Sequence, residues 1–110
     1  MTHDLIENQR QRVVKLQGDV DLEHSPAIRR ILLGAVAEMR DVLVDLSDVT
    51  YLDSSGIACL VEALQAARTN GTELGLVAVS VQALRVLQLA RLDMIFKIHD
   101  DLAAALEAGA

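Results

Sequence analysis

Two neighbouring serines near the middle of the chain are the side chains best placed to do chemistry. Ser54 and Ser55 stand between Asp53 and Gly56, where a strand-like stretch gives way to a helical pattern. A serine at such a junction can serve as a nucleophile, as in hydrolases, or can accept a phosphoryl group at the start of a helix. The surrounding residues help to decide between these chemistries.

Hydrolase chemistry is disfavoured because its motif and its base are missing. A nucleophile elbow needs the pattern G-x-S-x-G, and Leu52 occupies the place of the first glycine. The three histidines, His3, His24 and His99, have no context that favours a catalytic base. We therefore expect no catalytic residue and a protein that is not an enzyme.

Metal and cofactor sites are not predicted either. One cysteine and three scattered histidines provide no ligand spacing, and no G-x-x-x-x-G-K loop occurs. The alternating acids Asp19, Asp21 and Glu23 favour a solvated turn. We expect neither a metal nor a cofactor.

Composition indicates one compact domain over residues 1–110. Hydrophobic residues make up 52% of the chain and aromatic residues 2%, which predicts an aliphatic core. The formal net charge of −6 and the scarcity of aromatics disfavour binding to nucleic acids. No signal peptide or membrane-spanning stretch is visible, and the single Cys59 fits a reducing compartment. We expect a cytoplasmic protein, monomeric by default.

Apolar runs and helical periodicity alternate along the chain. They predict strands at 4–8, 12–18, 41–46, 73–79 and 96–99, and helices at 26–39, 54–69, 81–90 and 101–108. This alternation predicts an α/β fold: a mixed, mostly parallel sheet of four to five strands with about four helices. The first strand should run antiparallel to the second, because the short connection suits a hairpin.

Polar residues and glycines mark where the helices should begin and end. The second helix should begin with Ser54 as its cap and end at Gly71 in a left-handed conformation. The other helices should be capped at their N-termini by Ser25, Ser80 and Asp100.

Three longer segments resemble the STAS domain family, typified by bacterial anti-sigma factor antagonists. They are GDVDLEHSPAIRRIL, DVLVDLSDVTYLDSSGIACLV and LRVLQLARLDMIFKIHDD. The D-S-S-G tetrapeptide follows a strand and opens a helix, as the family pattern requires. The similarity covers about residues 5–106, nearly the whole chain.

The resemblance implies a phosphorylation switch at Ser55. In such antagonists, an anti-sigma factor that is also a kinase phosphorylates the second serine of D-S-S-G, and a phosphatase resets it. The unphosphorylated antagonist binds the kinase and frees a sigma factor. By the same resemblance, Asp21, Asp53, Ser54 and Gly56 join Ser55 in the partner-binding surface, and ATP belongs to the partner.

Two alternative functions remain open. STAS proteins also serve as cytosolic subunits of Mla-type phospholipid transporters, where they bind the ABC transporter ATPase; a standalone nucleotide-binding module is the other possibility. One departure from the antagonist pattern is Leu22, where family members often carry a polar residue. Leu84, Leu87 and Ala90 suffice for the buried face of the third helix. The helix and its exit carry four further apolar residues, Val86, Leu89, Leu92 and Met94. Of these, Val86 and Leu89 could remain exposed as a partner surface or pack beneath the last helix.

Overall fold

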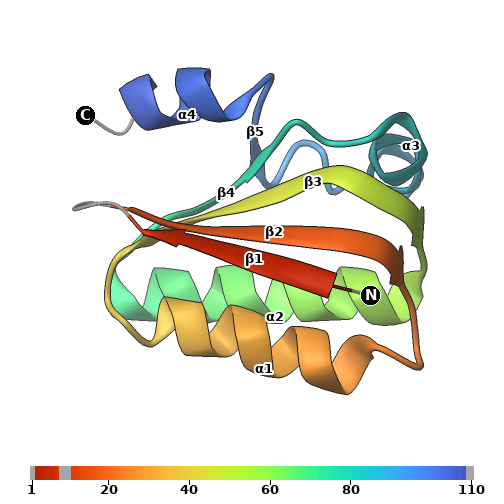
Figure 1. The fold of residues 1–110 in the computed structure, drawn as a ribbon, viewed down its shortest axis with the longest axis horizontal. Coiled ribbons are helices and arrows are strands. Elements are labelled where there is room, and N and C mark those ends of the chain that lie inside the picture. Colours follow the sequence, from red (N-terminus) through yellow and green to blue (C-terminus); the bar gives the residue numbers. More distant parts are fainter. Residues whose placement is uncertain (1, 8–10, 109–110) are drawn as a thin grey trace.

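The chain forms a five-stranded sheet with two helices on each face (Figure 1). The structure is a computed structural model that describes residues 2–7 and 11–108. Its elements are β1 (Thr2–Glu7), β2 (Gln11–Val20), α1 (Ser25–Val36), β3 (Asp41–Leu52), α2 (Ser54–Asn70), β4 (Leu74–Val77), α3 (Val81–Leu89), β5 (Lys97–His99) and α4 (Leu102–Ala108). The order is the predicted one, and residue 8 of the predicted first strand lies outside the described residues.

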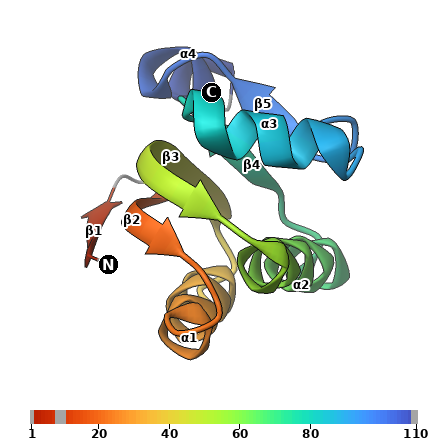
Figure 2. The same cartoon turned by 90° about the vertical axis from the view of Figure 1, so that its right-hand side faces the viewer.

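The strands lie in the order β1-β2-β3-β4-β5. As predicted, β1 is antiparallel to β2, and the other neighbouring pairs are parallel. Helices α1 and α2 cover one face, while α3 and α4 lie on the other (Figure 2). Because each helix follows a parallel strand, the N-termini of α1 and α2 meet at the edge where β2 and β3 end.

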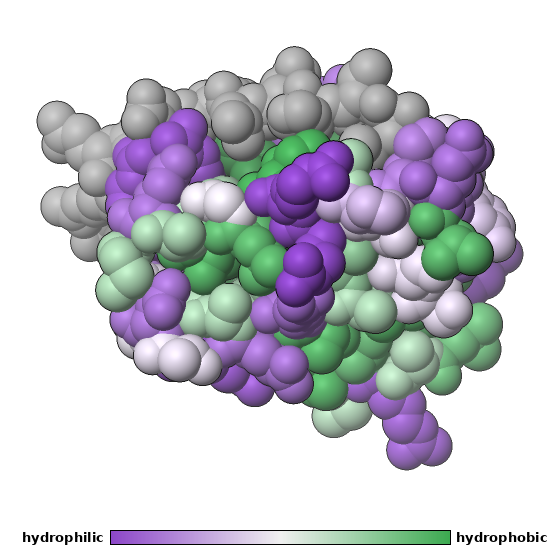
Figure 3. Space-filling model, turned by 90° about the horizontal axis from the view of Figure 1, so that it is seen from below, coloured by the Kyte–Doolittle hydropathy of each residue, from purple (hydrophilic) through white to green (hydrophobic). Residues whose placement is uncertain are grey.

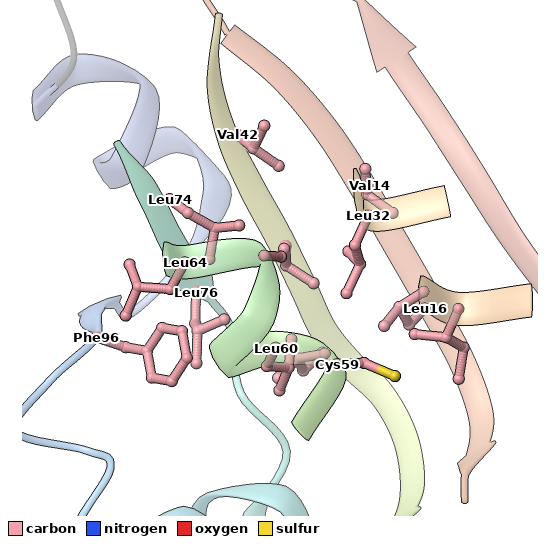
Figure 4. Close-up of a cluster of buried hydrophobic side chains, with 14 of the residues drawn as sticks. Val14, Leu16, Leu32, Val42, Cys59, Leu60, Leu64, Leu74, Leu76 and Phe96 are labelled. Atoms are coloured by element: carbon pink, nitrogen blue, oxygen red, sulfur yellow. The ribbon is translucent and has the colours of Figure 1, made fainter. Parts of the chain in front are cut away.

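An aliphatic core fills the space between the sheet and the helices α1 and α2. Figure 4 shows side chains of both helices converging on the sheet, with Phe96 at one end of the cluster. Ten labelled members are Val14, Leu16, Leu32, Val42, Cys59, Leu60, Leu64, Leu74, Leu76 and Phe96. A smaller cluster beneath α4 joins Val13, Leu43, Val77 and Ala105. The prediction of an aliphatic core is confirmed.

Strand β3 is twice as long as predicted, and this difference places the serine pair. We predicted a connection over residues 47–52, but β3 continues to Leu52. Within the described residues, this second half pairs with β2 alone, since β3 pairs with β4 only at residues 42–45. Its polar residues are therefore exposed, which is why they read as a loop. Strand β2 is also longer than predicted, because it continues past Gly18 to Val20. Gly18 has a positive φ of 80° and lies beside a shift in the register of β2 against β3.

Four of the predicted helix ends can be compared directly with the structure, and the start of α2 is described below with the site. Two of the four are confirmed and two are wrong. Gly71 ends α2 with φ 77°, and Ser80 caps α3 by accepting from the Ala83 N–H at 3.2 Å. Ser25 is not a cap, because its hydroxyl donates to the Leu22 carbonyl instead. The predicted cap of α4, Asp100, is wrong by one residue. Asp101 caps this helix instead and accepts from the Ala104 N–H at 2.7 Å.

In the described part of the chain, no helix has both the length and the apolar character needed to cross a lipid bilayer.

Candidate functional site

Asp53 caps the helix that carries the two serines. Its Oδ1 accepts from the backbone N–H groups of Ser55 and Gly56 at 2.9 and 3.1 Å. These N–H groups lack partners within the helix, and a carboxylate also complements the positive end of the helix dipole. The prediction that Ser54 caps α2 is wrong: Ser54 is the first helical residue, and its side chain is exposed.

The same carboxylate joins the tetrapeptide to the loop between β2 and α1. Asp53 Oδ2 accepts from the Leu22 N–H at 3.2 Å, and the Asp53 N–H donates to the Val20 carbonyl at 3.2 Å. Residues that are 31 to 33 positions apart are thereby held side by side. This brings the predicted partner-binding residue Asp21 to the same edge of the sheet as the D-S-S-G segment.

Asp21 is itself held by His24, a contact that no sequence pattern predicted. Its Oδ1 lies 2.7 Å from His24 Nδ1 and accepts from the His24 N–H at 3.1 Å. Partial burial opposes ionisation of Asp21, but these hydrogen bonds outweigh it and lower the pKa of the carboxyl group below 3.8. Stability from this bond is present at neutral pH and decreases as the pH falls through that lowered pKa.

The Asp21–His24 contact also explains a group of potential metal ligands. One ligand atom each from Asp21, Glu23 and His24 lie within 4.8 Å of one another. The predicted solvated turn is therefore more ordered than expected. Asp21 and His24 already bond each other, and Glu23 is exposed. The hydrogen bond between Asp21 and His24 therefore accounts for the closeness of these side chains.

The three residues after Asp53 differ strongly in exposure. Ser54 is exposed, Ser55 is half-buried and Gly56 is buried. A Cβ atom at Gly56 would lie 2.5 Å from the Val20 carbonyl oxygen, closer than packed atoms approach. The glycine therefore lets the first turn of α2 lie directly against the end of β2, and this contact positions Ser55.

Two exposed apolar side chains flank the site. Leu22, next to the Asp53 bond, is 72% exposed, and Tyr51 at the end of β3 is 52% exposed. Leu22 belongs to the loop that Asp53 joins to α2, and Tyr51 precedes Asp53 by two residues. The departure at Leu22 thus adds apolar surface at the predicted partner-binding edge.

The apolar residues around α3 divide between core and surface. Leu87 is buried and Leu84 half-buried, whereas Ala90, predicted to be buried, is exposed. Of the additional residues, two pack partly against the core, Val86 and Leu92. The other two are 82% and 86% exposed, Leu89 and Met94. Leu89 is therefore exposed, as the partner-surface alternative requires, whereas Val86 is partly packed against the core.

Cys59 lies on α2 one turn after Ser55, and its thiol faces the first turn of α1. Its Sγ lies 3.4 Å from the Ser25 carbonyl oxygen, and burial raises the pKa of the thiol. The thiolate is the reactive form, so we expect the native protein to react with iodoacetamide at pH 7 at least about tenfold more slowly than the urea-unfolded protein. Equal rates would show that α1 and α2 separate readily.

Comparison with known families identifies this arrangement. The profile of the STAS domain matches residues 3–105. The chain belongs to the STAS domain family. This confirms the resemblance and the predicted fold class.

Several of the proteins that this chain resembles are anti-sigma factor antagonists. The anti-sigma-B factor antagonist of Bacillus subtilis (strain 168) is 26% identical over 95 residues, which cover 86% of this chain and 87% of the relative. An anti-sigma factor antagonist structure from Mycobacterium paratuberculosis is 28% identical, with a TM-score of 0.89, covering 98% of this chain and 92% of that chain. The Bacillus protein SpoIIAA, solved in its phosphorylated form, shares the fold at 17% identity, with a TM-score of 0.76 and coverage of 97% and 98%.

These similarities relate the chain to regulatory binding proteins that act on anti-sigma factors, and they do not favour the transporter-subunit alternative. The D-S-S-G segment lies in the part of the chain that the family profile covers.

Proposed function

We propose that this chain is an anti-sigma factor antagonist that binds an anti-sigma factor kinase and is switched off by phosphorylation of Ser55. The observation that carries the proposal is the Asp53 cap. It anchors Ser55 in the first turn of α2, half-exposed, and joins it to the loop that holds Asp21 and Leu22. These contacts support a docking surface that includes Ser55, Asp21 and Leu22.

The chemistry at Ser55 is a phosphoryl transfer in which the partner supplies ATP. Ser55 Oγ bonds to the γ-phosphorus, the bond from that phosphorus to the bridging oxygen breaks, and ADP leaves. The hydroxyl proton passes to a base of the kinase. Hydrolysis by a phosphatase regenerates the serine, and this cycle belongs in the cytoplasm with the transcription machinery.

Phosphorylation at this position changes the surface more than the fold. The phosphoryl group adds about −1.5 to −2 charges at pH 7, and the start of α2 favours negative charge. The SpoIIAA structure supports the idea that this fold accommodates a phosphoryl group. At a docking surface that includes the apolar Leu22 and Tyr51, the added charge has to be desolvated for the kinase to bind, so the complex is weakened.

Mass spectrometry after incubation with ATP and an anti-sigma factor kinase tests the site. We expect the chain to gain one phosphoryl group, about 80 Da. Ser55→Ala should show no gain, while Ser54→Ala, the neighbouring and more exposed hydroxyl, should retain it. A gain in Ser55→Ala that disappears in Ser54→Ala would contradict the assignment. Co-purification with an ABC transporter ATPase and no kinase would contradict the function itself.

A further inference from the structure

A groove between α1 and α2 begins at Ser55. Its volume is about 550 Å³, and its lining includes Ser55 and Glu62 from α2 together with Arg29 and Arg30 from α1. Figure 3 looks onto this face of the molecule, where hydrophilic side chains lie between apolar ones. The groove is therefore polar and charged along part of its length, and the proposed phosphoacceptor is one of its walls.

The groove carries an excess of positive charge in a chain whose net charge is −6. Arg29 forms a bidentate pair with Glu62: Nε to Oε2 is 2.8 Å, and Nη2 to Oε1 is 2.7 Å. Among the residues that the structure describes, Arg30 has no ion-pair partner. Two arginines and one glutamate thus line the groove, which leaves it with one net positive charge.

The direction of the helices brings these arginines toward the serine. Helices α1 and α2 both begin at the edge of the sheet where β2 and β3 end (Figure 2). Long helical side chains lean toward the N-terminus of their helix. By this rule, the side chains of Arg29 and Arg30 extend toward the end of the groove that Ser55 occupies.

We propose that this groove is an internal binding site for the phosphoryl group of phosphorylated Ser55. Arg30 pairs with the phosphate directly, and Arg29 exchanges Glu62 for the phosphate, because guanidinium groups bind phosphate in the bidentate geometry that Arg29 now shows with a carboxylate. The inference rests on Ser55 being the phosphorylated residue. It adds that phosphorylation rearranges the surface between α1 and α2 and leaves Glu62 without its partner.

The test uses the full chain with phosphoserine incorporated at position 55 during synthesis, so that no kinase is needed. A ³¹P NMR titration gives the second pKa of the phosphate. We expect a value lower than in the urea-unfolded protein, raised by about 0.5 pH unit when Arg30→Gln is introduced. Glu62→Gln, which releases Arg29, should lower it further. Arg85→Gln, an exposed arginine of α3 on the other face of the sheet, is the matched control and should leave it unchanged.

An identical phosphate pKa in the unsubstituted, Arg30→Gln and Glu62→Gln proteins would overturn the inference, since the phosphoryl group would then lie outside the groove. Circular-dichroism spectra verify that each variant is folded. Failure of a kinase to phosphorylate Ser55 would instead contradict the proposed function, and it has no bearing on where an incorporated phosphate lies.

Discussion

Replacing Gly56 by alanine is expected to lower the free energy of unfolding by about 3 kcal/mol, at the upper end of the usual cost of overpacking. The new methyl group would lie 2.5 Å from the Val20 carbonyl oxygen and 2.7 Å from Leu52 Cδ1. A side chain could rotate away, but the carbonyl is backbone and already accepts from the Asp53 N–H. Either β2 or the first turn of α2 has to move.

Gly34→Ala is the matched control for this substitution. Gly34 lies inside α1, and a Cβ atom there would meet nothing within 4 Å. Alanine restricts the unfolded chain and favours a helix, so this variant should gain about 0.5–1 kcal/mol. Urea unfolding followed by circular dichroism measures both. Equal stability of the Gly56→Ala and unsubstituted proteins would show that the start of α2 shifts freely.

The order of the elements could be predicted because it depends on local patterns. Alternating apolar runs and helical periodicity identify βαβ units, and the handedness of crossovers then restricts the sheet. Gly71 and Ser80 were predicted for the same reason, since each acts within its own turn. The second half of β3 could not be predicted, because residues 47–52, three of which are polar, are ordered by pairing with a strand about 30 positions earlier.

The candidate site shows the same division between local and long-range signals. The D-S-S-G motif located it, but Asp53, and not Ser54, proved to be the cap. The spacing Asp53-x-x-Gly56 is compatible with an aspartate cap at a helix start, so this signal was present. The bond from Leu22 to Asp53 and the groove beside Arg30 depend on how separate segments pack, which no local pattern encodes.

Asp53 should be the side chain with the largest combined effect on stability and on the geometry of the site. Asp53→Ala removes the acceptor for three backbone N–H groups, those of Ser55, Gly56 and Leu22. Loss of a cap costs about 1 kcal/mol, and loss of a charge-assisted bond adds a similar amount at a partly exposed position, so we expect the free energy of unfolding to fall by about 2 kcal/mol.

Asp53→Asn separates the two roles of the carboxylate. Asparagine keeps one side-chain oxygen and caps helices as well as aspartate does, so the Ser55 and Gly56 amides should stay protected from hydrogen exchange. Its amide nitrogen cannot accept from the Leu22 N–H, so that amide should exchange faster, as it does in Asp53→Ala. An unchanged Leu22 exchange rate in Asp53→Asn would mean that the loop between β2 and α1 is held by its own contacts, chiefly Asp21 with His24. The phosphoacceptor and the docking loop would then be two independent surfaces, and the switch at Ser55 could act on one without the other.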